Sequence, residues 1–428
     1  MISTSSQTTS PPSSLSYFKE KYRSVRNQSL HLCAPLEKED MVVQPMVDVS
    51  PPKWHLGHTT WFFEKMILEE HFKGYQVFHP EYNYVFNSYY ESIGKRVLRT
   101  DRGNLTRPTT EEVYKYRAYV DEQMAHFLDT MTEVSSKVSE LLELGLQHEQ
   151  QHQELLVYDI KYILGNNPLF PAYTRKEIVP SIGSRALKFL PMSEANYKIG
   201  HQQEGFCFDN ELGVHQVYLH DFEIGDRLIT NGEYLEFMEA GGYQNFKYWY
   251  MEAWAWVEEN KETAPMHWHQ IDGEWYQYTF FGLQKLNPHE PVTHVSQYEA
   301  AAYAQWRGMR LATEFEWEAA CHRYEPSIHQ KANFIEDASL STQTAEQDHF
   351  QFYGDTWEWT NSAYLPYPYF KTETGAVGEY NGKFMINQMV LRGGSFATAR
   401  DHIRSSYRNF FHPHLKWHFT GIRLARYV

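Results

Sequence analysis

Apolar residues recur at spacings of three and four along the first part of the chain, and this period predicts helices. One helix is expected over residues 15–32. A second begins after Ser50, which can cap it, with two prolines in its first turn. A third begins at a capping box from Thr109 to Glu112. A fourth and longest pattern covers residues 138–162, so the four together predict a helical bundle.

The fourth helical pattern carries two histidines on its apolar face. His148 and His152 lie one turn apart, where apolar residues are expected. A buried imidazole needs a hydrogen-bond partner or a metal, and neutral imidazoles at this spacing can bind one ion. The spacing alone is a weak motif, because 22 histidines in 428 residues give about one such pair by chance, and His414 and His418 form another.

A third histidine, His58, shares the inner face of the second predicted helix with Trp54 and Trp61. Taken alone, it would be interpreted as a packed core histidine. Together with His148 and His152, it predicts a bundle with a metal in its core.

The sequence pattern changes after about residue 168. Residues 169–190 contain Pro, Gly and Ser without a long period and are expected to be a linker. Residues 191–428 have short strand patterns, many turns and two short capped helices. The chain is therefore expected to be a multidomain α+β protein, with a helical domain over residues 15–168. The first fourteen residues are rich in Ser, Thr and Pro, and we expect a disordered tail rather than a signal peptide.

Composition narrows the possible partners. The net charge is −15 and no basic patch occurs, which argues against nucleic acid. No apolar run is long enough to cross a membrane. The three cysteines are too scattered for a disulfide framework, so a reduced cytoplasmic location is expected. Oligomeric state is left open.

Four blocks in the second half resemble the sulfatase-modifying-factor domain, which has a C-type-lectin-like fold. They are Ile-Thr-Asn-Gly-Glu-Tyr at 229–234, Arg-Leu-Ala-Thr-Glu-Phe-Glu-Trp at 310–317, Trp-Glu-Trp at 357–359 and Leu-Arg-Gly-Gly-Ser-Phe at 391–396. The first half resembles the DinB-like four-helix domain. With the Trp-His-Leu-Gly-His and His-Glu-Gln-Gln-His segments, the combination resembles the sulfoxide synthases of ergothioneine biosynthesis, the hercynine oxygenases.

The resemblance implies an O2-dependent enzyme with non-heme Fe(II) held by His58, His148 and His152. Three neutral imidazoles suit Fe(II) and leave neighbouring positions open. The implied substrates are hercynine and a cysteine donor, whose sulfur becomes bonded to C2 of the hercynine imidazole and oxidised to a sulfoxide.

The same resemblance implies contacts with hercynine. Gln151 is expected near its imidazole, and Asn409, with Phe410, near its trimethylammonium-carboxylate end. Tyr364 and Tyr367 occur where the family places pocket tyrosines, and an aromatic cage would suit a quaternary ammonium. A packed aromatic loop is the alternative for these two residues.

The sulfur donor is expected to be free cysteine. Family members that use γ-glutamylcysteine carry an acid and an arginine where this chain has Phe411 and Leu415, so the clamp for the γ-glutamyl group is missing. A basic loop would ordinarily be solvated surface, but Arg102 or Arg107 could bind the cysteine carboxylate through bidentate contacts.

The subgroup that accepts free cysteine carries paired tyrosines, seen here as Tyr89 and Tyr90. One of the pair would deliver a proton or electron during O2 reduction, and it is preferred over Tyr364 for this role.

Several alternatives remain open from sequence. The nearest are the same reaction with γ-glutamylcysteine, a selenoneine synthase and an ovothiol-type synthase. A His-Glu-x-x-His zinc hydrolase would use Glu149 as general base. A formylglycine-generating enzyme would need cysteines late in the second domain, and none follows Cys321. A binding module without enzymatic activity is the remaining alternative.

Overall fold

The computed structural model describes residues 14–88, 94–175, 183–346, 349–372, 378 and 381–428. Its chain divides into two compact units. One comprises residues up to Ile163 with segments in 202–208 and 374–379, and the other comprises the rest. A helical first half and a mixed second half agree with the predicted fold class.

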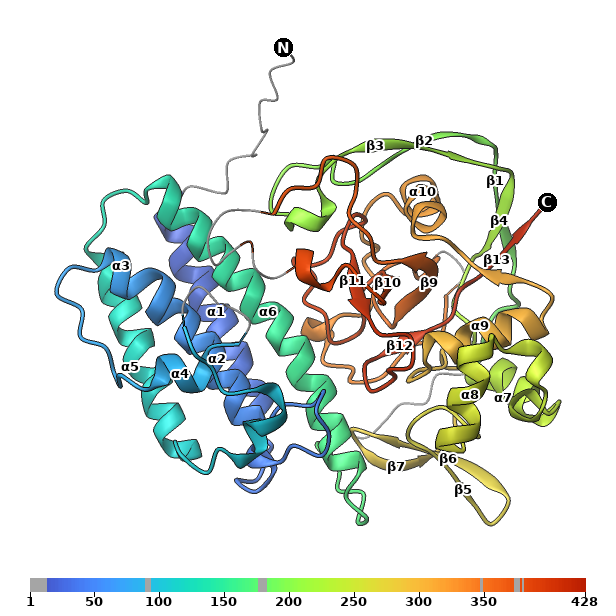
Figure 1. Ribbon diagram of the computed structural model, residues 1–428, viewed down its shortest axis with the longest axis horizontal. Coiled ribbons are helices and arrows are strands. Elements are labelled where there is room, and N and C mark those ends of the chain that lie inside the picture. Colours follow the sequence, from blue (N-terminus) through green and yellow to red (C-terminus); the bar gives the residue numbers. More distant parts are fainter. Residues whose placement is uncertain (1–13, 89–93, 176–182, 347–348, 373–377, 379–380) are drawn as a thin grey trace. The chain divides into compact units, whose positions relative to one another are not determined.

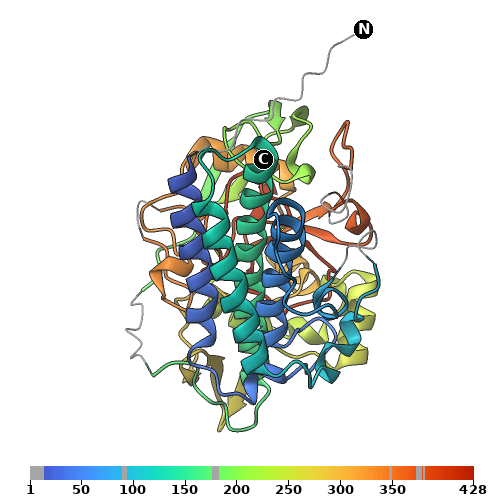
Figure 2. The same ribbon diagram turned by 90° about the vertical axis from the view of Figure 1, so that its left-hand side faces the viewer.

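The helical unit is built from long helices that run alongside one another, coloured blue to green in Figures 1 and 2. Its α-helices are α1 Leu15–Cys33, α2 Pro52–Phe63, α3 Glu69–His71, α4 Tyr82–Phe86, α5 Thr110–Asp129 and α6 Ser136–Gly165. A π-helical turn, Glu64–Leu68, extends α2, and 3-10 turns occupy Asp40–Val42 and Arg99–Asn104. The predicted bundle is confirmed.

The start of α2 differs from the expectation. Thr109 and Glu112 form the predicted capping box at α5, but the expectation that Ser50 caps α2 is wrong. Pro51 precedes the helix and no side chain caps it. The Ser50 hydroxyl instead accepts a hydrogen bond from Arg102 at 2.8 Å, so a tertiary contact has replaced the local one.

A buried carboxylate joins the four long helices. Glu149 of α6 accepts hydrogen bonds from Arg26 and Ser29 of α1, at 2.8 and 2.6 Å, and from Arg117 of α5. Arg26 also donates to Thr60 of α2 at 2.9 Å. Glu149 is 0% exposed, so its charge is compensated by the two arginines rather than by water.

The second unit contains short sheets, nearly all antiparallel. One has the order β1 Phe189–Met192, β4 Phe222–Gly225, β13 Leu424–Tyr427 and β8 Arg310–Leu311. Another has the order β11 Asn409–Phe411, β10 Met389–Arg392, β9 Trp357–Ala363 and β12 Thr420–Gly421. Two smaller sheets pair β2 Ala195–Ile199 with β3 His215–Leu219, and β5 Trp268–Ile271 with β6 Glu274–Thr279 and β7 Gly282–Lys285.

Four α-helices accompany these sheets: α7 Asn231–Glu239, α8 Met251–Asn260, α9 Gln297–Trp306 and α10 Glu314–Tyr324. The two short capped helices expected in this part of the chain are both present, with capping boxes at Ser296 for α9 and at Thr313 for α10. Shorter 3-10 turns lie at Asp209–Glu211, Gly242–Gln244, Phe246–Tyr248, Ile335–Asp337 and Gly382–Phe384.

The core of the second unit combines tryptophans with buried ion pairs. Arg423 donates to both oxygens of Glu358 at 2.7 Å, and the Trp317 indole donates to the same carboxylate at 2.7 Å. Arg408 makes a similar pair of bonds to Glu314, at 2.8 and 3.0 Å. These buried ion pairs connect short strands and helices whose own backbone hydrogen bonds are few.

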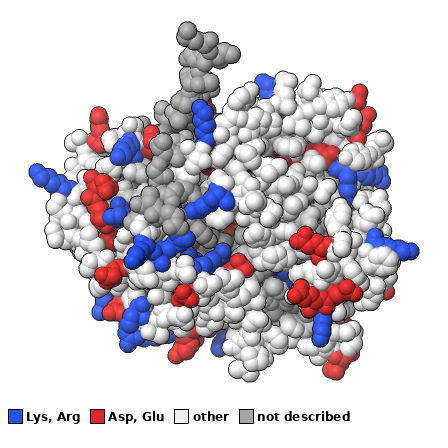
Figure 3. All heavy atoms as spheres, viewed as in Figure 1, with Lys and Arg blue, Asp and Glu red and all other residues white. Residues whose placement is uncertain are grey.

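In the described part of the chain, every helix is too short or too polar to span a bilayer. On the face shown in Figure 3, basic and acidic side chains both occur and neither sign covers it.

Replacing Glu149 by Gln should weaken the helical unit. We expect the free energy of unfolding to fall by about 3–5 kcal/mol, because the buried guanidinium of Arg117 loses its counterion and that of Arg26 keeps only the half-buried Asp121. Glu140→Gln, at an exposed position of α6, is the matched control and should change it by less than about 0.5 kcal/mol. Urea denaturation followed by circular dichroism measures both.

Acid should reduce the difference between wild type and the Gln variant. Burial alone would raise the pKa of Glu149, but Arg117 and Arg26 lower it from 4.5 to about 2. A lowered pKa stabilises the fold above pH 4.5, and that contribution is lost as the pH falls from 4.5 towards 2. Equal stability of the two proteins at pH 7 would contradict this role of the carboxylate.

Candidate metal centre

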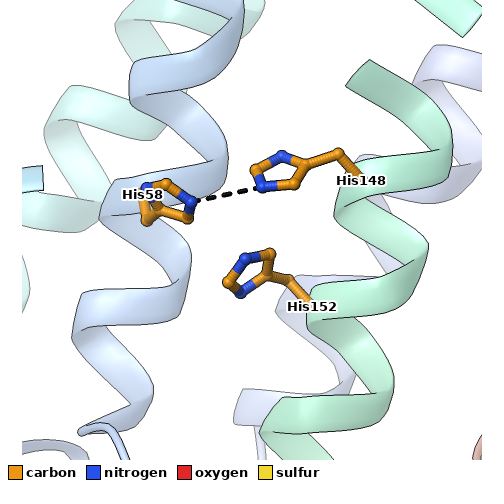
Figure 4. A group of neighbouring side chains, drawn as sticks. All are labelled: His58, His148 and His152. Carbon is orange, nitrogen blue, oxygen red and sulfur yellow. Dashed lines mark hydrogen bonds between the residues drawn. The ribbon is translucent and has the colours of Figure 1, made fainter. Parts of the chain in front are cut away.

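Three imidazoles from two helices converge inside the helical unit. His58 projects from α2, and His148 and His152 project from α6 toward it (Figure 4). One ligand atom of each lies within 4.8 Å of the others, and the Nε2 atoms of His58 and His148 are 3.2 Å apart. Two nitrogens bound at right angles to one ion, each about 2.1 Å from it, would be about 3.0 Å apart, so the His58 and His148 nitrogens are already spaced like two ligands of one ion.

The environment keeps these imidazoles neutral. Burial lowers the pKa of His58, and the neighbouring His148 lowers it further. Burial lowers the pKa of His148 to about 4. The pKa of His152 is also lowered, by burial and then by His148 and His58. At pH 7 each ring therefore has one nitrogen lone pair for a metal.

One contact fixes which nitrogen of His58 faces the site. The main-chain carbonyl of Phe86 lies 2.6 Å from Nδ1 of His58. A carbonyl oxygen only accepts, so we assign the proton to Nδ1 and the lone pair to Nε2. Nε2 is the atom that faces His148.

Glycine permits this contact. A Cβ at Gly57 would lie 2.1 Å from the Phe86 ring, so only a residue without one lets α2 approach the end of α4 this closely. His58 is thus oriented by a neighbour that packs against the preceding residue of its own helix.

A stack of planar groups supports His58 from its faces. The Trp54 ring stacks on His58 with centroids 4.7 Å apart and an interplanar angle of 11°, and Trp61 stacks on it at 5.5 Å. The guanidinium of Arg102 lies 3.3 Å from the centroid of Trp54. Arg102 is buried and donates to the hydroxyls of Ser50 and Ser88, at 2.8 and 3.0 Å. Arg107, by contrast, is exposed.

The structure argues against a hydrolase site at His-Glu-x-x-His. A general base must reach the reacting water, but both oxygens of Glu149 accept hydrogen bonds from Arg26, Ser29 and Arg117 in the bundle core. Its lowered pKa also makes it a weak base. The other histidine pair, His414 and His418, belongs to no metal-binding group, since the described residues contain only the one formed around His58.

Gln151 is half-buried on α6, between the two histidines of that helix. Tyr89 and Tyr90 lie outside the described residues. Sequence reasoning considered His55 only as an alternative to His58 as the third ligand and gave no role to Asp159, although His55 contacts a proposed ligand, His152, at 2.9 Å. Their spacing from the ligands, three and seven residues along the same helices, was the available signal.

The remaining predicted substrate residues belong to the second unit. Tyr364 is buried, stacks on Phe410 with centroids 4.1 Å apart, and accepts a hydrogen bond from Asn210 at 2.8 Å. Tyr367 is buried and its hydroxyl donates to Glu314 at 3.0 Å. These contacts agree with the packed-loop alternative, and a hercynine contact of either tyrosine stays a prediction.

Asn409 and Phe411 occupy the two ends of β11. The side-chain oxygen of Asn409 accepts from the Phe410 amide at 2.9 Å. The Phe411 ring lies 4.2 Å from that of His418 and 5.2 Å from that of Trp417, centroid to centroid. Position 411 is therefore part of an aromatic contact rather than of an ion pair.

Comparison with known families matches both units. Residues 21–156 match the DinB superfamily, and residues 192–428 match the sulfatase-modifying factor enzyme 1-like domain.

Three proteins named hercynine oxygenase are similar to most of the chain. The protein from Mycolicibacterium smegmatis is 29% identical over 407 residues, which cover 88% of this chain and 91% of that protein. The one from Mycolicibacterium thermoresistibile is 30% identical and the match covers 76% of this chain and 77% of that protein. The one from Mycobacterium tuberculosis is 31% identical, with 65% and 70% covered.

Replacing His58, His148 or His152 by Ala should remove most bound Fe(II), because each variant deletes one of three converging donors. Metal analysis after anaerobic loading and gel filtration measures the bound ion. His414→Ala, at an exposed position of the other histidine pair, is the control and should retain it. Full occupancy in His58→Ala would place the third ligand elsewhere, with His55 the first residue to test.

Proposed function

Because the chain belongs to the hercynine oxygenase family of sulfoxide synthases, we propose that it joins the sulfur of free cysteine to C2 of the hercynine imidazole. In the same turnover the sulfur is oxidised to the sulfoxide, as a step of ergothioneine biosynthesis. The observation that carries the proposal is the convergence of three neutral histidines in the DinB-like unit of such a chain.

The reaction balances without a further reductant. Cysteine and hercynine lose one hydrogen each when the C–S bond forms, which releases two electrons, and sulfoxidation releases two more. One O2 accepts all four, giving hercynyl-cysteine sulfoxide and one water. Fe(II), when bound by the three imidazoles, would activate O2 and bring the sulfur and the imidazole together.

The protein's own groups hold this centre in position. His58 is oriented by the Phe86 carbonyl and clamped between Trp54 and Trp61. Gln151 projects from the same helix as two of the ligands, and we propose that its amide binds the hercynine imidazole. For the opposite end of hercynine, the proposed contacts are Asn409 and Phe410, with Tyr364 and Tyr367.

We assign the cysteine carboxylate to Arg102 rather than Arg107. Arg102 is buried and stacks on Trp54, which itself stacks on His58, so its positive charge is held beside the metal centre. Arg107 is exposed and its guanidinium donates to the carbonyl of Thr106. A fixed buried guanidinium recognises a carboxylate with less loss of side-chain entropy than an exposed one.

Free cysteine is the proposed donor because the place of the γ-glutamyl clamp is apolar. Phe411 packs against His418 and Trp417, and Leu415 is half-buried and uncharged. A glutamyl carboxylate brought to these residues would lose hydration without gaining a counterion.

We expect kcat/KM for cysteine to exceed that for γ-glutamylcysteine by about 10-fold or more, the equivalent of one lost charge pair. Phe411→Asp combined with Leu415→Arg should narrow the ratio by restoring the clamp. His414→Arg adds a charge at a nearby exposed position and should leave the ratio unchanged. O2 uptake is measured in reactions that contain hercynine and one of the two thiols, and the products are identified by mass spectrometry. A wild-type preference for γ-glutamylcysteine would refute the assignment.

The tyrosine pair is the proposed source of the proton or electron. The segment that leads directly to Tyr89 is anchored at the centre, since the Phe86 carbonyl bonds to His58 and Ser88 bonds to Arg102. Adjacent residues of an extended segment point to opposite sides, so one of the two hydroxyls is expected to face the site.

Tyr→Phe at the inward position should leave Fe(II) and substrates bound but divert product from the coupled sulfoxide to cysteine sulfinic acid, because the donor is lost. The outward variant should change little, as should Tyr84→Phe, an exposed control on α4. Product ratios in single-turnover reactions decide this. If Tyr89→Phe and Tyr90→Phe both keep the wild-type ratio, the donor lies elsewhere, and Tyr364 or Tyr367 is the next to test.

A further inference from the structure

We propose that Asp159 and His55 are positioning residues that keep the proton of His152 on Nδ1 and so present its Nε2 to the metal. This inference rests on the metal role proposed for the three histidines. It adds a second layer of residues behind one of them, His152.

Hydrogen-bond contacts connect Asp159 to His152 through His55. Nε2 of His55 lies 2.9 Å from Oδ2 of Asp159, and Nδ1 of His55 lies 2.9 Å from Nδ1 of His152. His55 and Asp159 are both buried. The Ser50 amide donates to the same Oδ2 at 2.8 Å, which orients the carboxylate toward His55.

The direction of these bonds follows from what each group can offer. An ionised carboxylate only accepts, so the proton of that bond belongs to Nε2 of His55. A neutral imidazole carries one N–H, so Nδ1 of His55 is then an acceptor. The proton between the two histidines must therefore sit on Nδ1 of His152, and its lone pair is on Nε2.

The same tautomer results at His58 by a different route, through the Phe86 carbonyl. Two of the three ligands are thus pre-set to bind through Nε2. The tautomer of His148 is not fixed in this way, because its Nδ1 is buried without a hydrogen-bond partner among the described residues. A hydrogen bond to the far nitrogen also makes a ligating imidazole a better donor to metal.

A purely structural role for the pair predicts a different result. If His55 and Asp159 only stabilise the contact between α2 and α6, any replacement that preserves folding should leave metal affinity unchanged. A positioning role requires an acceptor at residue 55, and it requires nothing else of that side chain.

The test uses the full chain and Fe(II), with affinity measured anaerobically by competition with a chromogenic chelator. His55→Leu removes the acceptor and should weaken Fe(II) binding about 10- to 100-fold. His55→Gln supplies an amide oxygen to His152 and should recover most of the loss. Asp159→Leu should weaken Fe(II) binding less than His55→Leu does, because the His55 ring can still accept from His152, although its tautomer is no longer fixed. His126→Leu, exposed on α5, is the control.

A second measurement does not depend on any variant folding. Long-range proton–nitrogen correlation spectra of the metal-free, histidine-labelled wild type should show His152 protonated at Nδ1 and His55 protonated at Nε2 only. Protonation of His152 at Nε2, or of both nitrogens of His55, would overturn the proposal, as would an unchanged affinity in folded His55→Leu. Neither readout depends on which thiol or product the enzyme uses, so failure of the proposed reaction is recognised separately.

Discussion

The helical unit depends on one buried charge. Glu149 receives hydrogen bonds from Arg26, Ser29 and Arg117, and through Arg26 it is connected to Thr60 of α2. Because Glu149 follows His148 directly, the ion pairs that hold the bundle also fix the rotation of α6 about its axis. The ligands on the neighbouring face of that helix then meet His58 at a defined height. Structural charge and metal chemistry thus occupy adjacent residues and neighbouring faces of one helix.

Short sequence motifs and helical periodicity made several helix starts and the candidate metal site of the first unit predictable. The capping boxes at Thr109, Ser296 and Thr313 are made within four residues of sequence, and all three are present. The convergence of His58 with His148 could be expected because helical periodicity places both on inner faces. The likeness to known families then supplied the second fold and the identity of the metal, which periodicity alone does not contain.

The errors and omissions concern contacts between distant residues. Ser50 was expected to cap α2, but its hydroxyl serves Arg102, 52 residues away, and its amide serves Asp159, 109 residues away. Glu149 has the spacing of a catalytic base in the His-Glu-x-x-His motif. Only the tertiary structure reveals that Arg26 and Arg117 bind its carboxylate. The link from Asp159 to His152 through His55 was also hidden, since neither spacing nor residue type says which imidazole nitrogen meets which partner.

The closeness of α2 and α4 has an evolutionary consequence. Phe86 fills the space that a side chain at Gly57 would need, and the carbonyl of the same Phe86 orients His58. A single methyl group at residue 57 would neither bind metal nor contact substrate, yet it would push one ring and thereby turn one ligand. The side chains tolerated at residue 57 are thus limited by Phe86, a residue 29 places along the chain. A substitution that only adds a Cβ there would alter the metal site without changing any residue of that site.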